Sequence, residues 1–190
     1  MLRIAFKEWA VICRALAEGR QALILRKGGM SEVGDIFQPE HKRFWLFPTF
    51  VHQQEHGIKP EEMTRLQESD KDRPPKGIVR LSHFVEAPCV YQVRTLESAL
   101  LLNHLHLWAE DTVHQRFQYR YPGLHVMPVR VYRMPRVFDQ IETPGYAGCK
   151  SWVELEQDLP TDGAEPVLDE ETFRDSLRKL ETILNPTAFA

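Results

Sequence analysis

The pattern of apolar and polar residues in the first part of the chain predicts a strand hairpin. Two apolar runs, 9–16 and 22–26, flank a short connection that contains a glycine, which is typical of paired strands. A helix over 5–17 is the competing interpretation, because apolar residues there also recur at helical spacing. The apolar pair 11–12 and the run 23–25 form a matched set, and this match favours the hairpin.

A loop, a short strand and a turn of helix are expected next. Residues 30–40 are predicted to be a loop because they combine glycine, proline and mixed polarity. Residues 44–47 predict an aromatic strand that Pro48 halts. Residues 49–56 predict one or two helical turns, which Gly57 ends.

A helix, a connector and a strand pair follow. Residues 60–69 begin with proline and carry acids in the first turn, as helix starts often do. The charged, proline-rich stretch 70–77 predicts a surface connector. Residues 78–93 predict two paired strands with a turn at 86–88.

Periodicity in the second half of the chain predicts three helices and two strands. Helices are expected over 95–106 with Thr95 as the cap, over 108–117, and over 169–184, where an apolar stripe is clearest. The intervening residues predict, in order, a turn at 121–123, a strand over 124–133, an irregular stretch over 135–144, a strand over 151–155 and an acidic loop over 156–165.

These elements together predict an α+β fold. We expect a mixed or antiparallel curved sheet, of which a half-barrel is one form, with three to four flanking helices. Residues 1–155 are expected to form a single α+β domain, with two lobes joined by the charged connector 70–77. Residues 156–190 add an acidic loop and a C-terminal amphipathic helix.

Composition limits the class of protein. No apolar run reaches the roughly 18–20 residues that span a bilayer, and the first residues lack the long apolar stretch of a signal peptide. The three cysteines are far apart, which suits reduced thiols and disfavours a thiolate zinc site. A cytoplasmic protein without membrane attachment is therefore expected.

Charge is uneven along the chain. Residues 1–60 hold 9 Lys and Arg against 6 Asp and Glu, whereas residues 151–190 hold 3 against 10. A solvated, solubilising tail is the simpler interpretation of the acidic end. A tail that screens a basic surface from polyanions is the alternative.

The turn after the predicted hairpin carries a candidate anion site. Arg26 and Lys27 precede Gly28 and Gly29, whose backbone amides can face outward and form a nest for an anion. A guanidinium can hold phosphate through two parallel bonds. The spacing is not that of a Walker loop, and a hairpin end with solvated cations is the competing interpretation.

Imidazoles and a further arginine follow this turn. His41 and His52 are candidate acid–base groups and Arg43 is a second candidate phosphate ligand, because binding residues gather where strands end. His52, Glu55 and His56 also match the H-x-x-E-H zinc pattern, in which two histidines share a helical face. The segment is short and polar and lacks an evident third ligand, so no metal ligand is assigned.

Two later groups have weaker candidate chemistry. Aromatic residues beside arginine, as in Tyr119-Arg120-Tyr121, are what stacked bases need, whereas Trp45 and Trp108 are interpreted as core residues. Cys149 lies between a glycine and a lysine, where a thiol can become nucleophilic. A small core residue is the favoured interpretation of Cys149, which is retained as a ligand-binding candidate.

Three blocks of sequence occur in a characteristic order. They are KEWAVICRALAEG…ILRKGG, RFWLFPTFVHQ and YAGCKSWVEL. In these blocks, from residue 6 to residue 155, the chain resembles the domain-of-unknown-function 1802 family of prokaryotic proteins. The resemblance implies a one-domain organisation, brings no established activity, and leaves the acidic tail outside.

The sequence therefore favours binding of a phosphate-bearing ligand, a nucleic acid or a nucleotide, through a basic and histidine-rich edge. A hydrolase that uses His52, Glu55 and His56, either metal-dependent or phosphodiester-cleaving, is the first alternative. A protein–protein adaptor is the second. Whether a reaction is catalysed, which cofactor is used and the oligomeric state stay open at this point.

Overall fold

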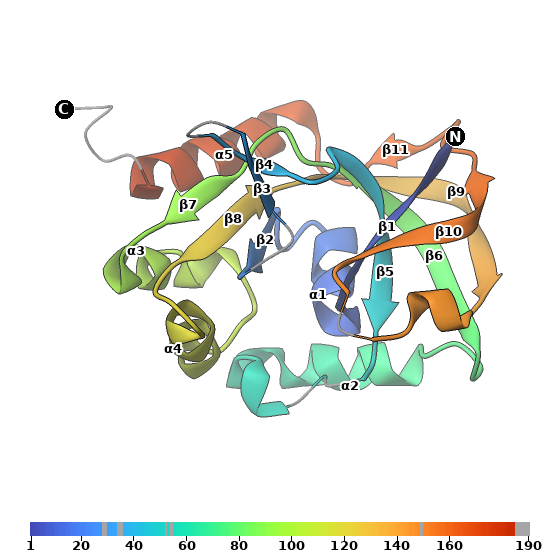
Figure 1. Cartoon of the computed structure of the whole chain (residues 1–190), viewed down its shortest axis with the longest axis horizontal. Coiled ribbons are helices and arrows are strands. Elements are labelled where there is room, and N and C mark those ends of the chain that lie inside the picture. The colour runs from blue at the N-terminus through green and yellow to red at the C-terminus, as the bar shows by residue number, and fades with distance from the viewer. Residues whose placement is uncertain (28–29, 34–35, 52, 54, 149, 185–190) are drawn as a thin grey trace.

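The β-structure of the chain consists of a mixed six-stranded sheet, a three-stranded sheet and a two-stranded hairpin (Figure 1). The computed structural model describes residues 1–27, 30–33, 36–51, 53, 55–148 and 150–184, with the backbone alone for 30–33 and 36–39. Five α-helices accompany the strands in this part of the chain, one more than the upper limit expected. The predicted α+β class with a mixed sheet is confirmed.

The six-stranded sheet has the order β10-β1-β5-β6-β9-β11. Its strands are β1 Leu2–Trp9, β5 Arg43–Thr49, β6 Ile78–Glu86, β9 Arg130–Ile141, β10 Trp152–Leu159 and β11 Glu165–Pro166. Among the described strands only β1 and β5 run parallel, in a register that places Trp9 beside Thr49. The carboxyl ends of these two strands therefore lie together at one end of the sheet.

Each face of this sheet borders a separate core. Phe6, Phe44 and Leu46 belong to the larger core, to which the helix α1 (Ala10–Ala17) also contributes buried side chains. Trp45 and Phe47 point the other way into a second core, because successive side chains of a strand alternate between faces. The single-residue alternation along β5 thus divides its aromatic side chains between two cores.

The sheet curls without closing. Gln157 Nε2 on β10 donates a hydrogen bond to Gln140 Oε1 on β9 over 3.5 Å, although three strands lie between β10 and β9 in the sheet order. Tyr146 is buried in the second core, and its hydroxyl oxygen accepts a hydrogen bond from the Glu156 amide at 3.0 Å. The first bond joins β10 to β9, and the second ties the connection between β9 and β10 to β10, so the sheet is curved but open.

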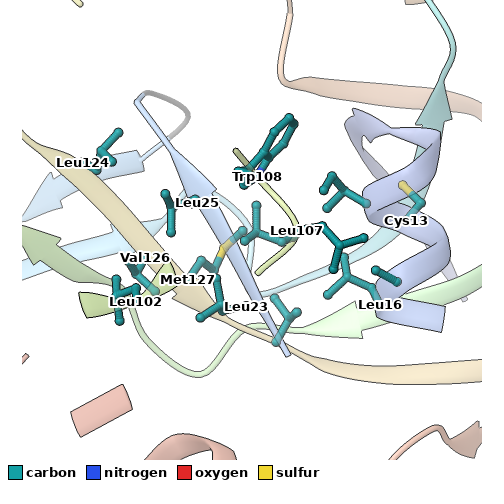
Figure 2. Packing of buried hydrophobic residues seen from close by; sticks show 14 of the residues in the cluster. Cys13, Leu16, Leu23, Leu25, Leu102, Leu107, Trp108, Leu124, Val126 and Met127 are labelled. Atoms are coloured by element: carbon teal, nitrogen blue, oxygen red, sulfur yellow. The ribbon is translucent and has the colours of Figure 1, made fainter. Parts of the chain in front are cut away.

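The three-stranded sheet lies on the far side of α1 (Figure 1). It has the order β2-β8-β7, with β2 Leu23–Arg26, β8 Leu124–Pro128 and β7 Tyr91–Val93. Figure 2 shows how Leu23 and Leu25 of β2 and Met127 of β8 pack in one cluster with Leu107 and Trp108 beside α1. The fully buried Trp108 confirms its predicted core role, and Trp45 is fully buried as well.

The remaining helices cover the outside of these sheets. They are α2 Met63–Lys71, which follows the short 3-10 helix Pro60–Glu62, then α3 Leu96–Leu101, α4 Glu110–Gln118 and α5 Glu170–Leu184. All four coincide with segments that the sequence predicts to be helical, although α2 runs two residues into the predicted connector and α4 one residue past its predicted end. Thr95 caps α3 by accepting the Ser98 amide at 3.2 Å. Helix α2 crosses below the end of β5 (Figure 1) and packs against α1.

The predicted N-terminal hairpin is wrong. Residues 2–9 form β1, residues 10–17 form α1, and β2 pairs with β8 instead of a preceding strand. Helix α1 is buried on nearly all sides, so its sequence lacks the polar face that normally reveals helical spacing. Its β-branched pair 11–12 then resembles a strand.

Three other local predictions are also wrong. The backbone of the expected loop 30–40 forms a hairpin, β3 Met30–Val33 with β4 Ile36–Pro39. The strands within 78–93 exist but do not pair with each other, since β6 joins the larger sheet and β7 the smaller one. The irregular stretch expected over 135–144 continues β9 as far as Ile141.

Candidate functional site

A cleft of about 1120 Å³ lies at the carboxyl ends of the two parallel strands. Its lining comes from the ends of β1 and β5, the start of α1, the α2–β6 connector and the segment 142–148. Ligands of open sheets commonly bind in the crevice outside the carboxyl ends of parallel strands. The topology of the sheet therefore creates this cleft where a binding site is expected.

The lining of the cleft is strongly cationic. Among the described residues, eight cationic side chains line it against three carboxylates, although the whole chain has a formal net charge of −3. The cations are Lys7, Arg14, Arg26, Arg73, Lys76, Arg80, Arg116 and Lys150, and the carboxylates are Glu8, Asp72 and Glu142. A cleft lined by one sign of charge concentrates ligands of the opposite sign.

Glu8, near the end of β1, is a buried carboxylate in the lining of the cleft. It follows Phe6 by two positions on β1, so the pleat of the strand directs its side chain to the α1 face of the sheet. The side chain is 1% exposed, and its Oε1 accepts the Trp9 amide at 2.8 Å. A carboxylate this deeply buried requires a cationic partner.

Arg26 is that partner. At the end of β2 it places Nη1 3.5 Å from Glu8 Oε2, and its Nη2 donates to Ser151 Oγ over 2.6 Å. The guanidinium also lies over the Phe6 ring, 4.8 Å from the ring centroid. Arg26 therefore connects β1, β2 and the start of β10 at the cleft floor.

Arg116 of α4 brings a second guanidinium to the same place. It lies 3.6 Å from the centroid of the Trp108 ring and donates from Nη1 to the Leu25 carbonyl over 3.4 Å. Burial is the main cause that lowers the pKa of Arg116 to about 10; Glu8 opposes this shift and Arg26 adds to it. Arg116 thus stays charged at neutral pH, and Glu8 is the carboxylate that acts on it as well as on Arg26.

The rim of the cleft adds cations of two kinds. Arg14 and Arg80 are neutralised, Arg14 by three acidic neighbours and Arg80 by Asp139 at 2.8 Å. Lys76 and Lys150 are exposed and form no ion pair with a described carboxylate. These two lysines are therefore free to meet an incoming anion.

His83 of β6 is the imidazole that lines the cleft. Its Nδ1 lies 2.9 Å from Ser82 Oγ, and its Nε2 is buried without a hydrogen-bond partner. Burial, with a smaller contribution from Arg133, lowers the pKa of His83 to about 4. His83 is therefore neutral under physiological conditions.

Of the residues predicted to bind an anion, Arg26 alone is seen to line the cleft. Lys27 donates instead to the carbonyls of Phe117 at 3.0 Å, of Gly123 at 2.6 Å and of Tyr121, so all three ammonium hydrogens have acceptors. Burial lowers the pKa of Lys27. Gly28 and Gly29 lie outside the described residues.

His41 and Arg43 lie at the opposite end of β5. The His41 ring packs edge-on against Trp152, with 5.1 Å between centroids. Arg43 Nε lies 3.4 Å from Glu86 Oε1, and its Nη2 donates to Thr161 Oγ1 over 3.2 Å. The structure therefore does not bring His41 and Arg43 to the cleft that Arg26 lines.

The other candidate residues, those of the histidine pattern and the cysteine, are not seen in the cleft. His52 and Cys149 lie outside the described residues, while Glu55 and His56 are exposed in the short 3-10 helix Glu55–Gly57. Of the one or two helical turns expected over 49–56, the described part of that range holds only the 3-10 residues Glu55 and His56, while Thr49 ends β5 and Gln53 has no regular structure. Where the chain is described, no group of three or more His, Cys, Asp or Glu is placed to hold a metal ion.

Sequence reasoning missed the two residues that define the cleft floor with Arg26. Glu8 gives a signal only once β1 is assigned, because a carboxylate then occupies a buried position two residues after Phe6. Arg116 belongs to an aromatic and basic group in the sequence, but nothing there indicates that α4 approaches β1. Lys76 lies in the predicted connector, where a solvated charge is the ordinary interpretation.

Comparison with known proteins identifies the family. The model of the family described as "Domain of unknown function (DUF1802)" matches residues 5–179. The chain belongs to this family. The match continues beyond residue 155, where the resemblance was expected to end, and it includes β10, β11 and most of α5.

The other comparisons add two results. No curated protein and no solved structure matches the chain. None of the helices in the described residues is both long enough and apolar enough to span a membrane. The family thus provides a relationship without a known activity, and inference about function must begin from the cleft.

Proposed function

We propose that the protein binds a phosphate-bearing ligand, a nucleic acid or a nucleotide, in the cleft at the carboxyl ends of β1 and β5. One observation carries the proposal: Arg26 and Arg116 both line the cleft, where Arg26 pairs with Glu8 at 3.5 Å and Glu8 also acts electrostatically on Arg116. Two half-buried guanidiniums near one buried carboxylate leave an excess positive charge where water screens it only in part. A bound phosphate group would supply the missing negative charge.

The arginines and lysines of the cleft would have different roles in binding. Arg26 and Arg116 would hold phosphate oxygens, because a planar guanidinium binds them through paired hydrogen bonds. The exposed rim residues Lys76 and Lys150 would attract the ligand and contact neighbouring phosphates as point charges. Binding should therefore depend strongly on salt, because each phosphate contact releases condensed counterions.

The proposal changes which residues serve the function that the sequence suggests. Arg26 keeps its role as a phosphate ligand. The role assigned to Lys27 and Arg43 passes to Arg116 and the rim lysines, because the donors of Lys27 are occupied by carbonyls and Arg43 is paired with Glu86.

Salt-dependent binding of a labelled single-stranded oligonucleotide tests the proposal. If four phosphates are contacted, affinity should fall roughly fifty-fold between about 50 and 200 mM salt. The double variant Lys76→Gln/Lys150→Gln should lower the slope of log affinity against log salt by about 1.4, because two contacts are lost. Fluorescence anisotropy over a salt series measures both quantities.

A matched double variant on α5 provides the control. Arg178→Gln/Lys179→Gln removes the same net charge from exposed positions that do not line the cleft, and it should leave the slope unchanged. Equal effects of the two double variants would place binding outside the cleft. Absence of binding to oligonucleotides and nucleotides at low salt would reject the function itself.

A further inference from the structure

The loop that follows α4 carries an exposed aromatic and basic triplet, Tyr119-Arg120-Tyr121. The two tyrosines are 57% and 60% exposed. Arg120 lies over the Tyr119 ring, 5.1 Å from its centroid, and Lys27 lies over the Tyr121 ring at 4.4 Å. Two aromatic side chains, each paired with a cation, therefore stand at the surface.

The backbone of this loop is strained. Arg120 has a φ of 62°, and it is the only non-glycine residue with positive φ in the described part of the chain. The Tyr121 amide donates to the Tyr119 carbonyl over 2.8 Å, which closes a tight turn of three residues around Arg120. Turns of this kind with positive φ at the centre are rare, and such strain often marks a functional position.

Lys27 holds the strained loop in place. Its ammonium donates to carbonyls before, within and after the triplet, those of Phe117, Tyr121 and Gly123. An ordered loop can present its aromatic rings without the entropic cost of fixing them at the moment of binding. The lysine that the sequence suggests as a phosphate ligand thus supports a neighbouring contact surface.

The triplet adjoins the cleft. Arg26 lines the cleft floor and Lys27, the next residue, holds the loop. Arg116 also lines the cleft, and Tyr119 follows it by three residues on the same helix end. A polyanion that leaves the cleft beside Arg26 and Arg116 would meet the two tyrosines within the length of a few nucleotides.

We propose that the ligand of the cleft is a single-stranded polynucleotide whose bases stack on Tyr119 and Tyr121 while Arg120 contacts its backbone. This inference rests on the proposed function and extends it from a phosphate group to a strand. Exposed aromatic side chains beside cations are the surface that sequence-tolerant binding of single strands requires, because every base has a face that can stack. DNA and RNA share this chemistry.

The test compares a short strand with a ligand that fills only the cleft. Oligothymidylate and oligouridylate of about eight nucleotides are the strands. Inorganic tripolyphosphate, which has phosphates but no bases, reports on the cleft alone. Tyr119→Ala/Tyr121→Ala should weaken binding of a strand at least about tenfold, since one lost stack already has an effect of that order. It should leave tripolyphosphate binding unchanged.

Two further variants separate stacking from loop shape. Tyr119→Phe/Tyr121→Phe retains the rings and should bind the strands as the unchanged protein does. Lys27→Met releases the loop and should weaken strand binding while tripolyphosphate still binds. Thermal unfolding checks that each variant is folded.

The outcomes separate this inference from the function on which it rests. If the alanine variant binds strands normally while Lys76→Gln/Lys150→Gln weakens them, the loop inference is wrong and the cleft proposal stands. If the unchanged protein binds neither strands nor tripolyphosphate, both are wrong. Loop-dependent binding to vesicles of phosphatidylserine and phosphatidylcholine, with normal strand binding by the alanine variant, would also overturn the loop inference. A preference for one of the two strands supports the inference and identifies the nucleic acid.

Discussion

Arginine side chains lie at both ends of β5, Arg43 from the strand itself and Arg26 and Arg116 from β2 and α4, and the two ends differ in how that charge is neutralised. At the amino end, Arg43 pairs with Glu86 across the sheet, and both side chains are nearly half exposed. At the carboxyl end, about 16 Å further along the strand, Arg26 and Arg116 share the buried Glu8. An arginine with its own carboxylate leaves no net charge at the surface. Two arginines beside a single carboxylate leave a net positive charge, which an anion can neutralise.

Removal of the shared carboxylate should have the largest effect. Glu8→Gln keeps an oxygen for the Trp9 amide but leaves the half-buried Arg26 and Arg116 without the negative charge of Glu8. We expect the free energy of unfolding to fall by about 3 kcal/mol. Tripolyphosphate should restore much of this loss, because a ligand at about 100 times its Kd stabilises the folded state by about 2.7 kcal/mol. Urea unfolding with and without the ligand measures both changes.

The matched change at the other end of the strand is Glu86→Gln. Because the Arg43–Glu86 pair is exposed, its loss should lower the free energy of unfolding by less than about 1 kcal/mol, and tripolyphosphate should give no additional recovery. If Glu86→Gln and Glu8→Gln behave alike, the distinction between the two ends of β5 is wrong.

A smaller effect is expected from the neutral imidazole at the cleft end. In the folded state the pKa of His83 is lowered to about 4, whereas the ordinary value for a histidine in an unfolded chain is 6.5. Below pH 6.5 the unfolded state therefore binds more protons, and stability is lost as the pH falls towards 4. His83 should contribute a loss of about 2 kcal/mol between pH 7 and pH 4.5, and little further loss once the pH is below 4.

The variant His83→Gln isolates this contribution. Urea unfolding at pH 7 and pH 4.5 should show a smaller drop in the variant than in the unchanged protein. His114→Gln, at an exposed position of α4, should reproduce the drop of the unchanged protein. A drop that is the same in all three proteins would show that His83 is not held neutral at the cleft.

How much of the fold the sequence predicts depends on whether an element has a polar face. Helix α5 keeps an apolar stripe of which Phe173 and Leu180 are buried, and its period identifies it. Helix α1 lies between two sheets and has almost no polar face, so its period cannot distinguish it from a strand. Burial on all sides removes the signal on which the prediction depends.

The irregular stretch predicted over 135–144 is wrong because Pro135 lies within β9 and does not end that strand. Pro135 lies where the pairing between β6 and β9 shifts, between the partners of Leu81 and His83. A strand tolerates proline at a position where the ladder of hydrogen bonds is interrupted. The sequence shows the proline but not the interruption, which comes from the partner strand.

The candidate site was predictable only in part for a related reason. Arg26 is recognisable because it ends an apolar strand. Its partners Glu8 and Arg116 come from a strand and a helix whose approach depends on the tertiary fold. Arg43 and His41 looked like neighbours of Arg26 because all lie near strand ends. Arg26, however, ends β2 of the smaller sheet and lines the cleft, whereas His41 and Arg43 lie at the start of β5 in the larger sheet, away from the cleft.

The side-chain resonances of the arginines give the most direct test of the central claim, that the anion site is where Arg26 and Arg116 share Glu8. In isotope-labelled protein, tripolyphosphate should shift the guanidinium Nε–H signals of Arg26 and Arg116 with one common binding curve. The signal of Arg43 should stay in place. Equal shifts at Arg43, or no shift at Arg26 and Arg116 while the ligand binds, would contradict the account.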